Sequence, residues 1–316
     1  MSDISKEIIR GIKTFFIVPE ASLFPEDFLK TCCLRGYETY FLDVDPYCTL
    51  EKKIRTLFEL FPQVILFFNI DRPLHGIEWP IFIGTLQREY GERAMIGVTY
   101  QKRNSAEEVR AIERLYLYTI GIVCGCIGIG FQKTKNVHVF LTVLAANQAN
   151  GNRKSLRAFC DSGFKGQILL KGKTYHCSLR DISISHFSCT CSEDMPEIPL
   201  HEKIADIRLN LRGVLIKSDA VLCLKRVLED EMISVFVFRT ADGREGLDVD
   251  VQNKVNDLIF TSMNEGIQAL LSPYFRPVKG STVVSAHTSI PASLVSEKPE
   301  NTSKDEGMLQ CMEVIN

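Results

Sequence analysis

Hydrophobic and polar positions follow two different patterns along the 316 residues, and the pattern changes near residue 149. Before that point, continuous apolar runs such as residues 14–18 and 64–70 alternate with segments whose apolar residues recur at helical spacing. After it come short strand-like segments separated by turn residues. A continuous apolar run is typical of a strand that is covered on both faces. The chain therefore predicts two domains of different fold class.

The first half predicts five strand–helix units. The expected strands are residues 14–18, 37–43, 64–70 and 95–100, then a cysteine- and glycine-rich strand after Gly121; the expected helices are residues 25–34, 49–61, 79–90, 105–118 and 135–149. Within the second helix, Leu50, Ile54, Leu57, Phe58 and Phe61 form one apolar stripe. Ser105 and Glu108 have the spacing of a capping box. Such a succession indicates an α/β fold with an open, doubly wound parallel sheet.

One uncharged stretch, residues 115–131, resembles a membrane span at first sight. It is at the lower limit of the length that a spanning helix needs. It also contains Gly121, Gly125, Gly128 and Gly130. We interpret it as the end of a helix, a turn at Gly121 and a buried strand, and we expect no transmembrane segment.

The second half predicts an antiparallel β-barrel or sandwich. The expected strand segments are residues 166–170, 174–180, 181–191, 205–211, 214–227 and 232–239. A long apolar stripe then predicts a C-terminal helix, with Asp248 or Asp250 as its N-cap, that plugs or covers one end of the barrel. We divide the chain into an α/β domain (1–146), a hinge (147–152), a barrel domain (153–275) and a disordered tail rich in Ser, Thr and Pro (276–316).

Composition narrows the function. The chain has 37 Lys and Arg against 39 Asp and Glu, a net charge of −2, which argues against a protein that wraps DNA or RNA. It has eleven cysteines, an odd number, and begins without the apolar segment of a signal peptide. Buried thiols in a reducing cytoplasm are therefore the expected state.

The same cysteines could suggest a metal site, because two Cys-x-Cys pairs occur, Cys124/Cys126 and Cys189/Cys191. Structural zinc sites usually space their ligands two to four residues apart and need a second such pair. Residues i and i+2 of a strand share one face, so small buried side chains explain these pairs. We expect no metal, no cofactor and no catalytic residues, since no triad, metal cluster or phosphate-binding loop is present.

The first half resembles the receiver domains of bacterial response regulators in the order and spacing of its elements. The local match is best at FFNIDRP, where Asn69 falls at the position of the phosphoacceptor aspartate, and Thr99 and Lys133 lie near the family's threonine and lysine. Receivers place two acidic residues after the first strand, where this chain has Pro19 and Glu20.

These departures change what the first domain is expected to do. An amide at Asn69 cannot become an acyl phosphate, so a phosphorylated regulator is only an alternative. Asp71 and Glu20 are a second alternative, as ligands for a hard cation, although carboxylates at strand ends are common on solvated loops. We expect a degenerate receiver-like domain that contacts a protein partner.

Two motifs in the second half carry the functional prediction. Arg153-x-x-x-Arg157 is followed, after about two expected strands, by Asp181-Ile-Ser183-Ile-Ser-His186. Over residues 150–275 the chain resembles the PilZ family of bacterial cyclic di-GMP receptors, which combine RxxxR with Asp/Asn-x-Ser-x-x-Gly before a barrel. The resemblance implies that Arg153, Arg157, Asp181, Ser183 and His186 bind cyclic di-GMP.

The chemistry of these residue types agrees with such a ligand. A guanidinium can bind a phosphate through two bonds, pair with guanine O6 and N7, or stack on a base. A carboxylate at Asp181 can accept from the guanine N1–H and N2 amino group, and Ser183 can bond phosphate or ribose. Each motif alone is also compatible with a solvated linker or a strand-end turn.

His186 departs from the family pattern, which has glycine at this position. Glycine there suggests a positive φ or close approach of the ligand, and an imidazole either stacks on the ligand or crowds it. The resemblance implies a cytoplasmic signalling protein, of the kind that controls motility, adhesion or polysaccharide production, in which cyclic di-GMP sets the angle between two domains. The alternative is a PilZ-type adaptor that binds protein but no nucleotide.

Overall fold

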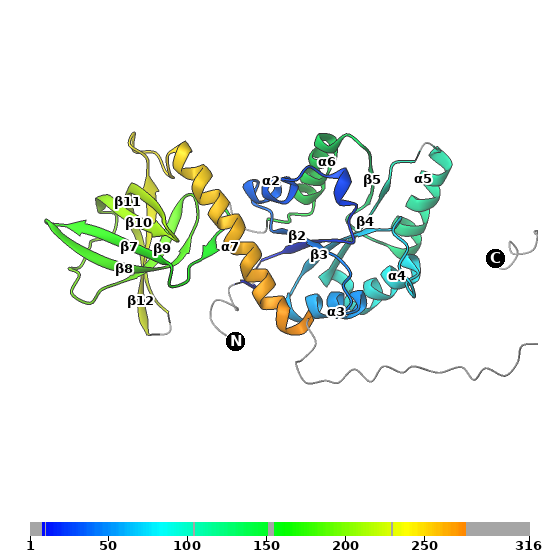
Figure 1. Cartoon of the computed structure of the whole chain (residues 1–316), viewed down its shortest axis with the longest axis horizontal. Coiled ribbons are helices and arrows are strands. Elements are labelled where there is room, and N and C mark those ends of the chain that lie inside the picture. The colour runs from blue at the N-terminus through cyan, green and yellow to red at the C-terminus, as the bar shows by residue number, and fades with distance from the viewer. Residues whose placement is uncertain (1–7, 10, 104, 151–154, 229, 276–316) are drawn as a thin grey trace, which may run out of the picture. The chain divides into compact units, whose positions relative to one another are not determined.

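The computed structural model describes residues 8–9, 11–103, 105–150, 155–228 and 230–275 (Figure 1). These residues all belong to one compact unit, Met1–Val278. Arg153 and the predicted disordered tail lie outside the described residues. The division into four segments therefore stays a prediction.

The first half folds into a five-stranded parallel sheet with strand order β2-β1-β3-β4-β5. Its strands are β1 (Lys13–Ile17), β2 (Thr39–Leu42), β3 (Val64–Asn69), β4 (Ala94–Gln101) and β5 (Cys126–Ile129). Its helical segments are η1 (Ala21–Leu23), α2 (Phe28–Leu34), α3 (Leu50–Leu60), α4 (Trp79–Tyr90), η2 (Gly91–Arg93), α5 (Ala106–Glu113), the π-helical η3 (Arg114–Ile120) and α6 (Lys133–Ala146). This strand order is that of flavodoxin-like doubly wound sheets, so the predicted fold class is confirmed.

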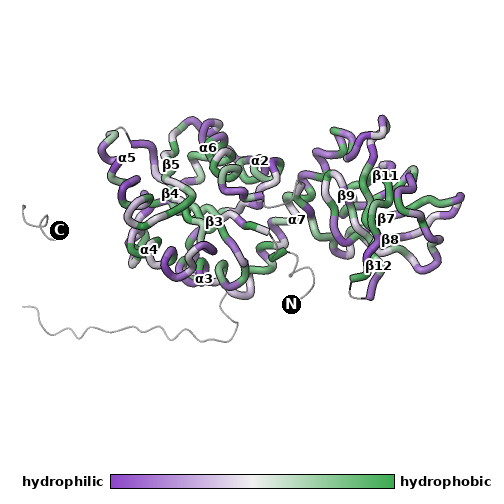
Figure 2. Tube along the Cα trace, turned by 180° about the vertical axis from the view of Figure 1, so that it is seen from behind, coloured by the Kyte–Doolittle hydropathy of each residue, from purple (hydrophilic) through white to green (hydrophobic). Residues whose placement is uncertain are grey.

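The apolar runs form strands because both faces of this sheet are buried. In β3, Leu66 and Phe68 join a cluster that includes side chains of α3 and α4. Ile65 and Phe67 belong to the opposite cluster, with side chains of α2 and α6. Hydrophobic colouring accordingly follows β3 and β4 (Figure 2). Alternate side chains of β3 thus pack into the two hydrophobic cores on opposite faces of the sheet.

Hydroxyl caps begin two of the helices, and the cap at Ser105 was predicted. The hydroxyl of Thr49 accepts from the Lys52 amide at the start of α3, and Ser105 caps α5 by accepting from the Glu108 amide. The uncharged stretch forms η3, a left-handed turn at Gly121 and β5, as predicted. Over the described part of the chain, every helix is too short or too polar to span a bilayer.

The second half forms a closed antiparallel barrel. Its strands are β6 (Ala158–Phe159), β7 (Phe164–Leu170), β8 (Lys173–Ile182), β9 (His186–Cys191), β10 (Lys203–Leu211), β11 (Val214–Leu228) and β12 (Glu231–Arg239). The strands follow the order β8-β7-β10-β11-β12-β9, and the barrel closes because the last strand, β9, pairs with the first, β8. The short strand β6 pairs with β8 outside this ring. Strands such as β7 alternate buried and exposed residues, which fills the barrel and leaves a polar outer face. Of the two predicted architectures, the barrel is confirmed.

The C-terminal helix α7 (Val249–Phe275) reaches beyond the barrel. Val255 and Ile259 belong to the hydrophobic cluster of the barrel, as expected for a helix that covers it. Ile267 and Leu271 instead belong to a cluster of the α/β sheet. A helix of 27 residues is about 40 Å long, more than one barrel end requires, so its second half packs on the other core.

Candidate functional site

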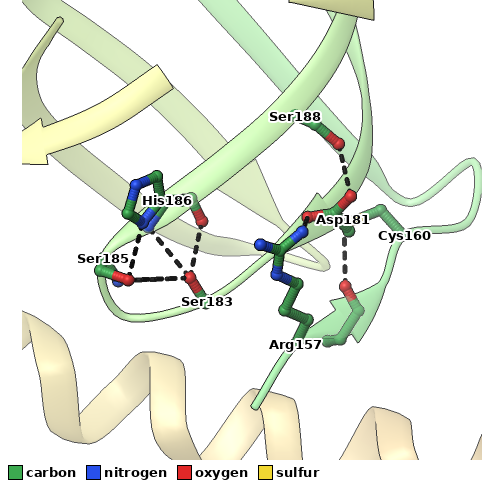
Figure 3. Close-up of polar contacts among 8 residues, drawn as sticks. Arg157, Cys160, Asp181, Ser183, Ser185, His186 and Ser188 are labelled. Carbon is green, nitrogen blue, oxygen red and sulfur yellow. Dashed lines mark hydrogen bonds and ion pairs between the residues drawn. The ribbon is translucent and has the colours of Figure 1, made fainter. Parts of the chain in front are cut away.

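Arg157 and Asp181 meet where β6 pairs with the end of β8. In this antiparallel ladder Phe159 lies opposite Asp181 and Ala158 opposite Ile182, which brings Arg157 to the same place. Nη1 of Arg157 donates to Oδ1 of Asp181 over 3.4 Å (Figure 3). Two motif residues that are 24 positions apart in the sequence are therefore adjacent in the structure.

The Asp181 carboxylate is held at both oxygens. The residue is 8% exposed, and its Oδ2 accepts a 2.6 Å bond from the hydroxyl of Ser188. Ser188 is itself 2% exposed and lies opposite Asp181 in the β8–β9 ladder. A buried carboxylate needs such hydrogen-bond partners. Arg157 at Oδ1 and Ser188 at Oδ2 together fix the orientation of the Asp181 carboxylate.

Ser183 occupies a turn rather than a strand, which corrects the prediction of one strand over residues 181–191. β8 ends at Ile182, and β9 begins at His186. The Ser183 hydroxyl accepts from the amides of Ser185 and His186 at 3.3 and 3.0 Å, and the Ser183 amide donates to the His186 carbonyl. A serine hydroxyl that bonds its own backbone closes this turn without glycine or proline.

His186 starts β9 directly beside this turn. Its φ is outside the left-handed region, so backbone strain gives no reason for a glycine here. The imidazole Nδ1 lies 2.8 Å from the Ser185 hydroxyl (Figure 3). Burial lowers the pKa of His186, and the positive charge of Arg157 acts in the same direction. The ring is therefore neutral near pH 7.

Two further residues lie in this region that no motif or spacing in the sequence indicates. Ser188 became visible only with the register of the β8–β9 hairpin. The Phe238 amide donates to the Ser185 carbonyl, which places the next residue, Arg239, near the turn. The positive charge of Arg239 also lowers the pKa of His186. Barrel closure brings β12 beside β9, with Val237 opposite His186, and no local spacing could have indicated it.

A cavity of about 210 Å³ also borders Arg157. Arg212 and Asp161 line it too, but they are paired with each other at 2.6 Å, and Arg212 also binds Glu265. Sites that enclose a drug-sized ligand are usually about 300–1,000 Å³. This cavity is therefore smaller than a typical site for a drug-sized ligand.

The receiver-like positions of the α/β domain are used structurally. The Asn69 side chain donates to the Val18 carbonyl and accepts from the Asp71 amide, both at 3.2 Å. Asp71 pairs with Arg103, and a hard cation would have to displace this ion pair. Within the described ranges, no three His, Cys, Asp or Glu side chains are placed to hold a metal ion.

The lowered pKa of His186 predicts a pH-dependent contribution to stability. The unfolded chain takes up a proton at His186 at a higher pH than the folded chain, so the folded state loses stability as pH falls from the unfolded pKa, about 6.5, toward the folded pKa. Chemical denaturation at pH 7.5 and 5.5 checks this. We expect His186→Gln to lose less free energy of unfolding over this interval than the original chain. An equal loss of unfolding free energy in His186→Gln and the original chain would contradict a lowered pKa of His186.

Comparison with known proteins gives structural neighbours only. No family model matches the chain, and no curated protein matches it. The crystal structure of Escherichia coli YcgR in complex with c-di-GMP is 17% identical, with a TM-score of 0.33, and the match covers 39% of this chain and 50% of that one. The PilZ domain of E. coli YcgR with c-di-GMP is 18% identical over 37% of this chain and 96% of that one, with a TM-score of 0.32.

A third neighbour is the Borreliella burgdorferi PlzA protein in complex with c-di-GMP. It is 12% identical, with a TM-score of 0.25, over 40% of this chain and 48% of that one. This chain thus matches about half of the length of YcgR and of PlzA.

Proposed function

We propose that the chain is a cyclic di-GMP receptor that acts by binding and not by catalysis. The observation that carries the proposal is the contact between Arg157 and Asp181 beside the Ser183–His186 turn. It places a guanidinium, a buried carboxylate, a hydroxyl and a neutral imidazole at one place. These groups are complementary to the phosphates and guanine edges of a cyclic dinucleotide.

Each residue has a distinct role in this proposal. The Arg157 side chain is 36% exposed, so the guanidinium nitrogen that does not bind Asp181 can contact a phosphate or a base. Asp181 accepts from guanine N1–H and N2, and His186 stacks on the base. Arg153 is assigned by its spacing from Arg157 in the motif, and Ser183 by its place in the turn. The receptor belongs in the cytoplasm, where its thiols stay reduced.

Strand β6 and helix α7 connect the ligand site to the α/β domain in this proposal. Arg157 directly precedes β6, and β6 packs against α7. Since α7 also contributes Ile267 and Leu271 to the α/β core, a ligand that reorders the chain around Arg157 shifts the contacts of β6 with this helix. The α/β domain then changes the surface it offers to a protein partner.

Isothermal titration calorimetry of the full chain tests the receptor assignment. We expect saturable binding of cyclic di-GMP with a micromolar or lower Kd, and no binding of GMP at the same concentrations. Absence of heat and of any thermal shift at several hundred micromolar cyclic di-GMP would overturn it.

The alternative is an adaptor that binds protein without nucleotide, and His186 is the observation that favours it. Its half-buried imidazole occupies the place where the resemblance expects glycine. Titration of His186→Gly distinguishes the two. Binding by the original chain supports the receptor. An original chain that does not bind supports the adaptor, and binding gained in His186→Gly then identifies the imidazole as the cause.

A further inference from the structure

Three cysteine side chains gather inside the barrel, apart from the candidate nucleotide site. They are Cys177 of β8 and Cys189 and Cys191 of β9, and the thiols of Cys189 and Cys191 lie 3.8 Å apart. The Cys177 thiol interacts with both. Gly166 stands opposite Cys177 on β7, and a Cβ there would overlap the Cys177 sulfur. The barrel thus leaves room for this cluster by omitting one side chain.

The register of the β8–β9 ladder selects one pair among the three. Cys177 lies directly opposite Cys191, while Cys189 lies opposite Leu179. The Ser192 amide donates to the His176 carbonyl, so those two residues form a hydrogen-bonded pair. Pairs alternate along an antiparallel ladder, and Cys177 and Cys191 are therefore a non-hydrogen-bonded pair.

This pairing has the spacing of a disulfide. Opposed Cα atoms in a non-hydrogen-bonded pair are about 4.5 Å apart. Disulfides join Cα atoms that are about 4.4–6.8 Å apart. Cys189 and Cys191 are two residues apart on one strand, which separates their Cα atoms by about 6.6 Å, at the far end of that range. Geometry favours the cross-strand pair.

Cys191 is also the thiol that is most suited to react. It is half-buried, whereas Cys177 is 5% exposed and Cys189 fully buried. Hydrogen bonds from the thiols of Cys177 and Cys189 lower the pKa of Cys191, and the Ser234 hydroxyl and the charge of Lys225 act in the same direction. A thiolate that is partly accessible is the form that attacks an oxidant.

We propose that Cys191 and Cys177 form a reversible cross-strand disulfide when the protein meets a hydroperoxide. The Cys191 thiolate attacks one peroxide oxygen, the O–O bond breaks, and Cys191 becomes a sulfenic acid as hydroxide leaves. The hydroxide takes up from solvent the proton that the Cys191 thiol had released, which gives the first water. The Cys177 sulfur then attacks the Cys191 sulfur, and the hydroxyl leaves with the Cys177 proton as a second water. Two thiols lose two electrons, and one hydrogen peroxide is reduced to two waters.

The disulfide would join the two strands that carry the candidate site. Cys177 is four residues before Asp181 on β8, and Cys191 is three residues after Ser188 on β9. Oxidation therefore fixes the ladder on which the Asp181–Ser188 bond lies. Disulfide formation itself requires no nucleotide, so it is tested independently of the proposed function.

Peptide mass spectrometry of the full chain tests this pairing. After treatment with hydrogen peroxide, alkylation and trypsin, Cys177 lies in peptide 174–180, and Cys189 and Cys191 lie together in peptide 181–203. We expect these two peptides to be joined, and dithiothreitol to separate them. Cys189→Ser should keep the link, and Cys191→Ser should lose it.

Cys223→Ser is the matched control, since this partly buried thiol of β11 bonds the Val235 carbonyl instead and should leave the link unchanged. A closed disulfide within peptide 181–203, a link that persists in Cys191→Ser, or full alkylation of all three thiols after peroxide would overturn the proposal. Circular dichroism of each serine variant confirms that it is folded before oxidation.

Discussion

Replacement of Arg157 by alanine is expected to weaken cyclic di-GMP binding at least about 100-fold. This corresponds to about 2.8 kcal/mol of binding free energy. Charge-assisted bonds contribute about 1.5–3 kcal/mol each, and a guanidinium on a phosphate makes two of them. Calorimetry of the original chain and of Arg157→Ala under the same salt concentration measures the difference.

Arg180→Ala provides the matched control for this loss. Arg180 directly precedes Asp181 in β8, but its guanidinium pairs with Glu231 at 3.4 Å and not with Asp181. The control removes the same charge from the neighbouring strand β8, so it should change the affinity by less than a factor of about three. Equal losses in both variants would show that only overall charge matters, and would contradict a specific role for Arg157.

Arg157→Lys separates charge from geometry. Lysine keeps the positive charge but lacks the planar fork that binds a phosphate through two bonds. We expect an affinity between those of the original chain and Arg157→Ala. An Arg157→Lys affinity equal to that of the original chain would mean that Arg157 acts as a point charge, and would contradict a bidentate contact with phosphate.

Apolar runs and spacing predicted the α/β half almost completely, because each buried strand there is flanked by its own helix. The residues of β3 are apolar throughout since both faces of the sheet are covered. The stripe from Leu50 to Phe61 predicted α3 to within a residue at each end. These signals are local, and the right-handed parallel connection leaves few alternative arrangements.

The barrel half was predicted less well because its register depends on distant partners. Alternation indicated strands but could not show that β9 pairs with both β8 and β12. Ser183 and Ser185 stand at alternate positions, which is the pattern of an exposed strand face, so the spacing predicts a strand where the structure has a turn. Its cause is a hydroxyl that accepts two amides, which spacing does not reveal.

The candidate site shows the same division. The motif resemblance indicated Arg157 and Asp181, and the structure places them in contact. Ser188 and Arg239 come to the site only through strand pairing and barrel closure. The helical stripe likewise predicted α7 but not that Ile259 and Ile267, two turns apart, would pack into different cores.

That division of α7 predicts that the two cores unfold as one cooperative unit. Asp257 lies in the half of the helix that packs on the barrel, yet it pairs with Lys30 of α2 at 2.6 Å. Glu265 lies near the other half and binds Arg212 of the barrel. Cys33 of α2 belongs to the barrel cluster. The contacts of the two cores are therefore interleaved along one helix.

Truncation of Ile259 and Ile267 to alanine tests this coupling. Ile259 is 2% exposed and Ile267 is 3% exposed, and such truncations cost about 2–5 kcal/mol of unfolding free energy. We expect both variants to lose a similar amount. Gln268→Ala, an exposed position on the same helix, should change stability by less than about 0.5 kcal/mol.

The decisive measurement uses the single tryptophan of the chain. Trp79 is 6% exposed and belongs to the α/β cluster, so its fluorescence in denaturant reports unfolding of that core. If the cores are coupled, Ile259→Ala in the barrel cluster lowers the Trp79 midpoint by as much as Ile267→Ala does. An unchanged Trp79 midpoint in Ile259→Ala, with a separate earlier transition in circular dichroism, would mean that α7 does not couple the cores. The proposed route from Arg157 through β6 and α7 would then fail as well, because a helix that does not couple stability between the cores has no means to transmit a shift from one to the other.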